Sequence, residues 1–184
     1  MMKNKVEIEN TFHEAEKLRI KGNLKLAIKL FQNILNENPN FPPALNNIAN
    51  CYFQLNEIGY AEKFYLKCLK IQPEQVQTLN NLALLYFRNN KFEKALPILK
   101  TSFLKKSNQE DVAEKIAYCL LELNLKEETH KFCEEALKSF KNNNKILFSY
   151  RTNLFKLGKN KEGLSALQKE TGLIEFGEDT IKII

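Results

Sequence analysis

Hydrophobic positions along this chain recur at helical spacing, and the helical segments themselves recur at a longer period. Apolar side chains three and four positions apart predict amphipathic α-helices through most of the sequence. Residues 44–73 and residues 78–103 then carry nearly the same pattern, 34 positions apart. The matching pairs are Leu45/Leu79, Asn46/Asn80, Asn47/Asn81, Ala49/Ala83, Tyr52/Tyr86 and Ala61/Ala95. A fixed period of this length predicts a stack of similar helical units.

The same frame extends in both directions without an insertion. It divides the chain into 8–41, 42–75, 76–109, 110–143 and 144–177. Two positions in the frame favour small side chains: Ala15, Ala49, Ala83 and Ala117, with Arg151 as the exception, and then Ala27, Ala61, Ala95, Thr129 and Gly163. Turn-forming residues stand midway through each unit, at Lys21-Gly22-Asn23, Asn56, Asn89-Asn90, Asn124 and Gly158. Each unit is therefore expected to be two helices joined by a tight turn, with small residues where the helices cross.

This pattern resembles the tetratricopeptide repeat, in which W-x2-L-G-x2-Y is followed by A-x3-F and a closing proline. Four units over residues 8–143 match it, and residues 144–171 form a fainter fifth copy. Leucine replaces the tryptophan in three units, and the closing proline is kept in the first two, at Pro39 and Pro73. The resemblance implies an all-α fold, a right-handed α-solenoid of antiparallel helix pairs over residues 1–184. It also implies that the first helix of each pair lines a concave side.

An apolar tail, residues 172–184, follows the fainter fifth copy at 144–171. Two interpretations of this tail stay open. In the first, it caps the last repeat, because the ends of a solenoid need a cover. In the second, it pairs with another chain through Ile181, Ile183 and Ile184 and promotes self-association.

Composition narrows the class of protein. The 184 residues are 43% hydrophobic and 27% charged, with 6 glycines and 5 prolines, which indicates a globular and helical chain. The sequence contains no run of 18 apolar residues, so membrane insertion is not expected. The first residues do not resemble a signal peptide. A cytoplasmic protein is therefore expected.

No motif in the sequence points to catalysis. The four cysteines are far apart and form no CxxC pair, so reduced packing residues are expected at Cys51, Cys68, Cys119 and Cys133. Metal-ligand clusters, phosphate-binding loops and nucleophile motifs are not found either. The sequence thus predicts no cofactor and no enzymatic activity. The isoelectric point near 9.0 raises the question of RNA binding. However, the 34-residue period, and the positions that alanine and proline occupy within it, favour a protein-binding repeat.

The candidate binding residues share a place on the expected concave side: Asn46, Asn47, Asn50, Asn80, Asn81, Phe87, Arg88, Lys115 and Tyr118. An asparagine offers two donors and an acceptor on a short side chain. Two asparagines one repeat apart are suited to hold the carbonyl and N–H groups of an extended peptide. The alternative is that these asparagines are solvated and reflect a composition rich in asparagine and lysine.

A second variant concerns a partner's C-terminal carboxylate. Asn50, Asn81 and Lys115 fall where some proteins of the resembling family hold such a group. Asp111 stands where that arrangement needs a cation, and its charge would repel the carboxylate. The variant is therefore disfavoured.

Two functions are predicted. The first is a non-catalytic scaffold or adaptor that binds an extended peptide segment of a partner protein in its concave groove. The alternative is an assembly factor or chaperone of a bacterial envelope, secretion or motility complex, acting through its tail or its convex face.

Overall fold

The computed structural model describes the backbone of residues 5–171, 174–176 and 181–183. These residues divide into two compact units, which we call unit 1, ending at Asn89, and unit 2, beginning at Asn90. The expectation of a single solenoid over the whole chain stays a prediction.

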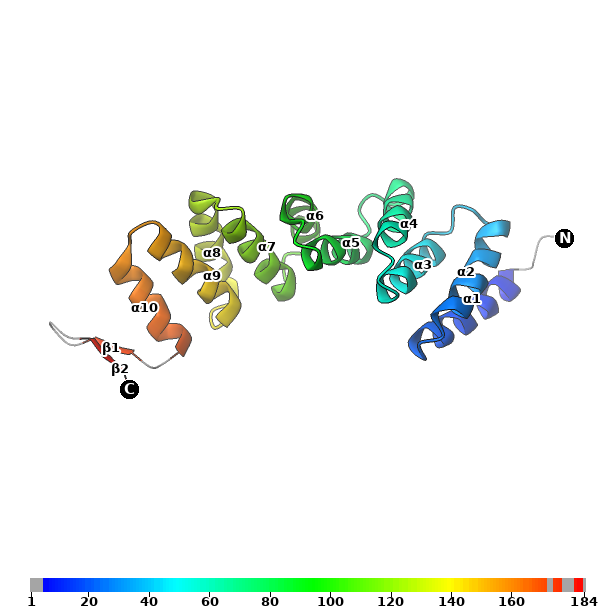
Figure 1. Cartoon of the computed structure of the whole chain (residues 1–184). Helices are drawn as coiled ribbons and strands as arrows, with labels where there is room; N and C mark the ends of the chain where they lie inside the picture. Colours follow the sequence, from blue (N-terminus) through cyan, green and yellow to red (C-terminus); the bar gives the residue numbers. More distant parts are fainter. Residues whose placement is uncertain (1–4, 172–173, 177–180, 184) are drawn as a thin grey trace. The chain divides into compact units, whose positions relative to one another are not determined.

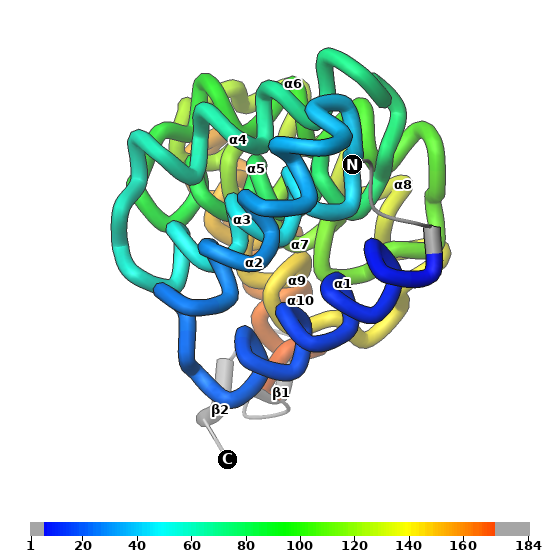
Figure 2. The backbone as a smooth tube through the Cα atoms, turned by 90° about the vertical axis from the view of Figure 1, so that its right-hand side faces the viewer, coloured from blue at the N-terminus to red at the C-terminus, as the bar shows by residue number. Residues whose placement is uncertain are grey.

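Unit 1 consists of five helices (Figure 1): α1 (Lys5–Ile20), α2 (Leu24–Glu37), α3 (Pro42–Gln54), α4 (Ile58–Ile71) and α5 (Val76–Arg88). Each helix packs on the next one along the chain, and α3 also contacts both α1 and α5. In Figure 2, α1 and α2 run next to each other as the first of these pairs. The first helices of the repeats thus line up beside one another within the unit.

Unit 2 continues with five more helices: α6 (Phe92–Lys105), α7 (Glu110–Glu122), α8 (Lys126–Ser139), α9 (Asn144–Lys156) and α10 (Asn160–Thr171). Every 34-residue repeat contains the two predicted helices, and the pairs that lie within one unit pack on each other: α1 on α2, α3 on α4, α7 on α8 and α9 on α10. A short antiparallel hairpin of β1 (Ile174–Phe176) and β2 (Ile181–Ile183) follows, paired as Ile174 with Ile183 and Phe176 with Ile181. Ile184 and the side chains of the tail lie outside the described residues, so both interpretations of the tail stay predictions.

The turn inside each repeat has one backbone conformation that recurs every 34 residues. The left-handed region is occupied at Gly22, Asn56, Asn90, Asn124 and Gly158, with φ between 53° and 80°. Glycine and asparagine are the residues that enter this region at least cost. A hydrogen bond closes the end of the first helix, for example from the N–H of Asn23 to the carbonyl of Leu18 at 2.9 Å. The predicted turn positions are therefore confirmed.

The small residues of the frame lie inside the helix crossings. Ala15, Ala27, Ala49 and Ala61 are fully buried in unit 1. At Gly163 in unit 2, an added Cβ would lie 2.7 Å from the ring of Phe155, so the α9–α10 crossing leaves little room there. Close helix approach explains the periodic choice of small residues.

Cysteines fill core positions, as predicted. Cys51, Cys68, Cys119 and Cys133 are buried and free of disulfides. Burial raises the pKa of Cys51 to about 11, although the charge of Arg19 lowers it slightly. A thiol with so high a pKa carries almost no thiolate at neutral pH, which makes it a poor nucleophile.

Two further properties concern the described residues as a group. None of their helices combines the length and the apolar character needed to cross a bilayer. Within the same residues, no three histidine, cysteine or acidic side chains gather closely enough to bind a metal ion.

Candidate functional site

Two neighbouring first helices of unit 1, α3 and α5, are almost free of charge. Their combined sequences contain one ionisable group with a full charge at neutral pH, the guanidinium of Arg88. Asparagines occupy the polar positions instead. The surface that these helices present is therefore shaped by amides rather than by ion pairs.

Three of the predicted asparagines form one hydrogen-bonded group, which we call the amide cluster: Asn46, Asn50 and Asn81. The side-chain Nδ2 of Asn81 donates to Oδ1 of Asn50 at 3.0 Å and to Oδ1 of Asn46 at 3.2 Å. Asn46 and Asn50 are on α3 and Asn81 is on α5, so the cluster joins adjacent repeats. Both N–H groups of the Asn81 amide are used in this way.

Tyr65 on α4 fixes the orientation of the cluster. Its hydroxyl donates to Oδ1 of Asn50 at 2.6 Å. Burial raises the pKa of Tyr65 far above its ordinary value, so the hydroxyl keeps its proton. Because Oδ1 of Asn50 receives two donors, its amide cannot turn over without losing both hydrogen bonds.

The cluster leaves one donor group and one acceptor without a protein partner. In the described part of the chain, neither Nδ2 of Asn50 nor Oδ1 of Asn81 has a hydrogen-bonding partner. Both residues are partly exposed. The two atoms together match the carbonyl and the N–H of a polypeptide backbone.

Asn46 has a packing role rather than a free one. It is 4% exposed, and its Oδ1 lies 3.1 Å from the hydroxyl of Thr78 on α5 as well as close to Asn81. The Thr78 hydroxyl is also 2.6 Å from Oε1 of Gln75. Asn46 is therefore the buried member of the amide cluster, and it holds Asn81 in place instead of contacting a ligand.

The two remaining predicted asparagines do not repeat this geometry. Asn47 stands 34 positions before Asn81 but is only 7% exposed, and Asn80 is partly buried. One repeat earlier, Asn46 corresponds to Phe12, which has no side-chain oxygen, and Asn50 corresponds to Glu16, whose carboxylate lies 3.8 Å from the ring of His13. The amide pairing therefore forms between α3 and α5 and does not extend to α1 by the same contacts.

Arg88 and Phe53 lie at the C-terminal ends of the same two helices. The guanidinium carbon of Arg88 is 5.4 Å from the centroid of the Phe53 ring, a cation–π contact. Beside them is a surface hollow of about 480 Å³, lined by Phe53, Gln54, Asn56, Ile58, Arg88 and Asn89. Phe87, another predicted residue, is partly buried.

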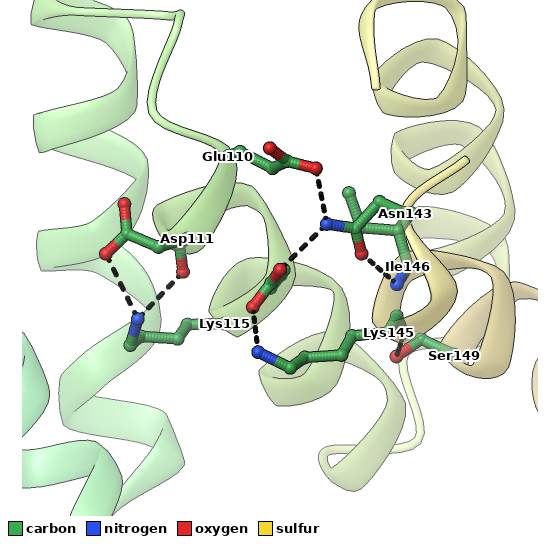
Figure 3. Close-up of polar contacts among 8 residues, drawn as sticks. Glu110, Asp111, Lys115, Asn143, Lys145, Ile146 and Ser149 are labelled. Atoms are coloured by element: carbon green, nitrogen blue, oxygen red, sulfur yellow. Dashed lines mark hydrogen bonds and ion pairs between the residues drawn. The ribbon is translucent and has the colours of Figure 1, made fainter. Parts of the chain in front are cut away.

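In unit 2, the predicted cation Lys115 is engaged by its own helix. Its Nζ donates to the backbone carbonyl of Asp111 at 2.8 Å and lies 3.2 Å from the Asp111 carboxylate (Figure 3). Lys115 is therefore partly neutralised. Tyr118 is exposed and meets Phe92 edge to face, with ring centroids 5.8 Å apart.

A polar junction between α7 and α9 was not predicted. Asn143 donates to carboxylate oxygens of Glu110 at 2.8 Å and Glu114 at 2.7 Å, and its Oδ1 accepts the N–H of Ile146 at 2.9 Å as an N-cap (Figure 3). Lys145 adds an ion pair to Glu114 at 2.7 Å. The i,i+4 spacing of the two glutamates was the available sequence signal.

The pKa of Glu114 reflects this junction. Burial acts to raise it, but hydrogen bonds from Lys145 and Asn143 outweigh burial and hold the pKa below its ordinary value. Glu114 is thus ionised at neutral pH. The junction stabilises packing and leaves its carboxylates occupied.

One family match coincides with a unit of the repeat frame. Residues 42–75 match a tetratricopeptide repeat model, and residues 64–96, which cross the boundary to the next unit of the frame, match a second model of the same description. No curated protein matches the sequence.

Solved structures match nearly the whole chain. One is MamA AMB-1, with a TM-score of 0.81, 16% identity, and coverage of 92% of this chain and 93% of that one. Another is YrrB, described as a TPR protein with an unusual peptide-binding site. Its TM-score is 0.80 at 15% identity, and the match covers 88% of this chain and 84% of that one. A double mutant of MamA RS-1 has a TM-score of 0.81 at 13% identity, and the match covers 94% of this chain and 96% of that one. Identities this low show the fold alone, and they confirm the predicted all-α solenoid of antiparallel helix pairs.

Proposed function

Because this chain belongs to the tetratricopeptide-repeat proteins, we propose that it is a non-catalytic scaffold whose unit 1 holds an extended peptide segment of a partner protein. The binding surface, which we call the peptide face, consists of Asn50, Phe53, Asn81 and Arg88 on α3 and α5.

One observation carries the proposal. Asn50 has a free amide donor and Asn81 a free amide oxygen, and both are held in place by hydrogen bonds on their opposite sides. A pre-positioned pair of this kind loses little side-chain entropy when a ligand binds. It recognises backbone groups, which every peptide has, so the ligand's main chain supplies affinity and its side chains supply selectivity.

The likeness to YrrB is consistent with this proposal, since that protein is described as having a peptide-binding site on the same fold. The lack of charge on α3 and α5, apart from Arg88, also suits a neutral backbone.

The test uses Asn50→Asp in the full chain. The substitution keeps an oxygen for the donors on Tyr65 and Asn81 but replaces the free N–H groups by a second oxygen. Peptides selected from a random library by the unchanged protein should bind this variant about tenfold more weakly, the cost of one unmade hydrogen bond to a desolvated carbonyl. Calorimetric titration measures the affinity.

The matched control is Asn36→Asp on α2. Asn36 is exposed, and its Oδ1 likewise accepts a hydrogen bond, from Gln32 at 3.3 Å. The control adds the same charge away from the peptide face and should leave affinity unchanged. Selection of no peptide by the unchanged protein, or equal affinity in both variants, overturns the proposal.

A further inference from the structure

We infer that Arg88, held over Phe53, forms a subsite for an acidic side chain of the bound peptide. This inference rests on the proposed function, because it assigns the selectivity of the same face.

The first support is the isolation of the charge. Arg88 is exposed and is the one charged residue on α3 and α5. No carboxylate among the described residues lies within ion-pair distance, 4.0 Å, of its guanidinium. Lys115 differs, because Asp111 already accompanies it at 3.2 Å. Of the two predicted cations, Arg88 is therefore the one whose charge is not already matched.

The second support is the position of the guanidinium. Its carbon lies 5.4 Å from the centroid of the Phe53 ring. An aromatic ring attracts a cation without neutralising its charge, so the guanidinium keeps the paired N–H donors that match the two oxygens of a carboxylate. The ring thus helps to position an arginine that is itself exposed.

The third support is the space beside the pair. The hollow of about 480 Å³ contains Arg88 and Phe53 together with Ile58 and three amide side chains, and none of its six lining residues is acidic. Phe53 and Ile58 offer apolar surface to the methylene groups of an aspartate or glutamate side chain. A chain-terminal carboxylate has no such methylenes, so the lining favours an internal acidic residue.

The distance to the amide cluster fits one continuous ligand. Arg88 follows Asn81 by seven positions on α5, which is about 10.5 Å along a helix. An extended peptide advances about 3.3 Å per residue. An acidic residue about three positions from the peptide bond held by Asn50 and Asn81 would therefore reach the guanidinium.

The experiment selects binders from a random-peptide library in which constant sequences flank both ends, so no free C-terminal carboxylate is near the variable region. The unchanged protein should enrich aspartate or glutamate at one position, and replacing that residue by its amide should weaken binding about tenfold. Arg88→Gln should remove the preference, and Arg88→Glu should reverse it toward lysine or arginine. Higher ionic strength should weaken the preference in the unchanged protein.

Lys63→Glu is the matched control, because Lys63 is an exposed cation on α4 and the charge change is the same. It should keep the acidic preference. If peptides are selected and depend on Asn50 but show no acidic preference, or if Arg88→Glu does not reverse it, the inference is overturned while the proposed function stands. Acidic enrichment that appears only at free C-termini also overturns it. Failure to select any peptide rejects the proposed function itself.

Discussion

Asn81 donates its side-chain amide to Asn50 across 31 positions of sequence, at 3.0 Å, while Tyr65 donates to the same oxygen at 2.6 Å. Oδ1 of Asn50 on α3 therefore accepts hydrogen bonds from side chains on both α4 and α5. This relationship joins stability and binding, because the bonds that hold two repeats together also fix the atoms that the peptide face presents.

The first prediction concerns the stability of unit 1. Asn81→Ala removes both donors from the amide cluster and leaves the oxygens of Asn46 and Asn50 with fewer partners. The free energy of unfolding should fall by about 1–3 kcal/mol, the range for the loss of two intramolecular hydrogen bonds. Denaturant titration followed by circular dichroism measures it. Asn36→Ala, at an exposed site on α2, should change it by about 0.5 kcal/mol or less; equal losses in both variants would contradict the cluster's structural role.

A second prediction separates orientation from stability. Tyr65→Phe removes one of the two donors that keep the Asn50 amide from turning over, so peptide affinity should fall together with about 1 kcal/mol of stability. Tyr86→Phe removes a hydrogen bond of the same length, 2.6 Å, which is directed at the Glu62 carboxylate outside the amide cluster. It should lower stability at least as much, because its acceptor is charged, but leave peptide affinity unchanged. Parallel losses of affinity in the two variants would reject the orienting role of Tyr65.

The turns give a third prediction. Gly22 has φ of +80°, and Asn56 adopts the same region in the next repeat with φ of +61°. Gly22→Ala should lower the free energy of unfolding by about 1 kcal/mol because alanine resists positive φ, although an added Cβ there meets no atom within 4 Å. Gly22→Asn should cost clearly less. Thermal denaturation of the two variants compares them, and a larger loss for asparagine would contradict the repeat-turn explanation.

The fourth prediction is a pH dependence in unit 2. The folded state lowers the pKa of Glu114 below its ordinary value of 4.5, so the unfolded chain binds a proton more readily. Its contribution to stability is therefore present above about pH 4.5 and is lost as pH falls through the lower folded pKa. Glu114→Gln should reduce stability at pH 7, and the difference from the unchanged protein should shrink toward pH 3. A constant difference between pH 7 and pH 3, measured by urea titration, would reject this assignment.

The repeat frame made the helices and turns predictable. Small residues at crossings and turn-formers 34 positions apart are local requirements of backbone geometry, so they can be identified without knowing the neighbours of each helix. The five positive-φ turns lie at the expected positions for this reason.

The amide cluster was only partly predictable, since an asparagine's role depends on the residue facing it from the preceding repeat. Asn81 finds Asn46 and Asn50 there, whereas the corresponding neighbours of Asn47 are Phe12 and Glu16, which provide no second amide. Period alone treats Asn47 and Asn81 as equivalent, although one is buried and the other joins two repeats. Lys115 shows the same limit: its i,i+4 partner Asp111 was visible in the sequence, but the ion pair emerged from the structure.

The central claim is that Asn50 and Asn81 hold a peptide by its main chain. An ester scan of a selected peptide tests it most directly, because replacing one amide by an ester removes a backbone N–H and keeps the side chains. The account predicts one position at which the ester weakens binding to the unchanged protein about tenfold, with much smaller effects elsewhere. An ester scan in which every position binds as tightly as the parent peptide would contradict it.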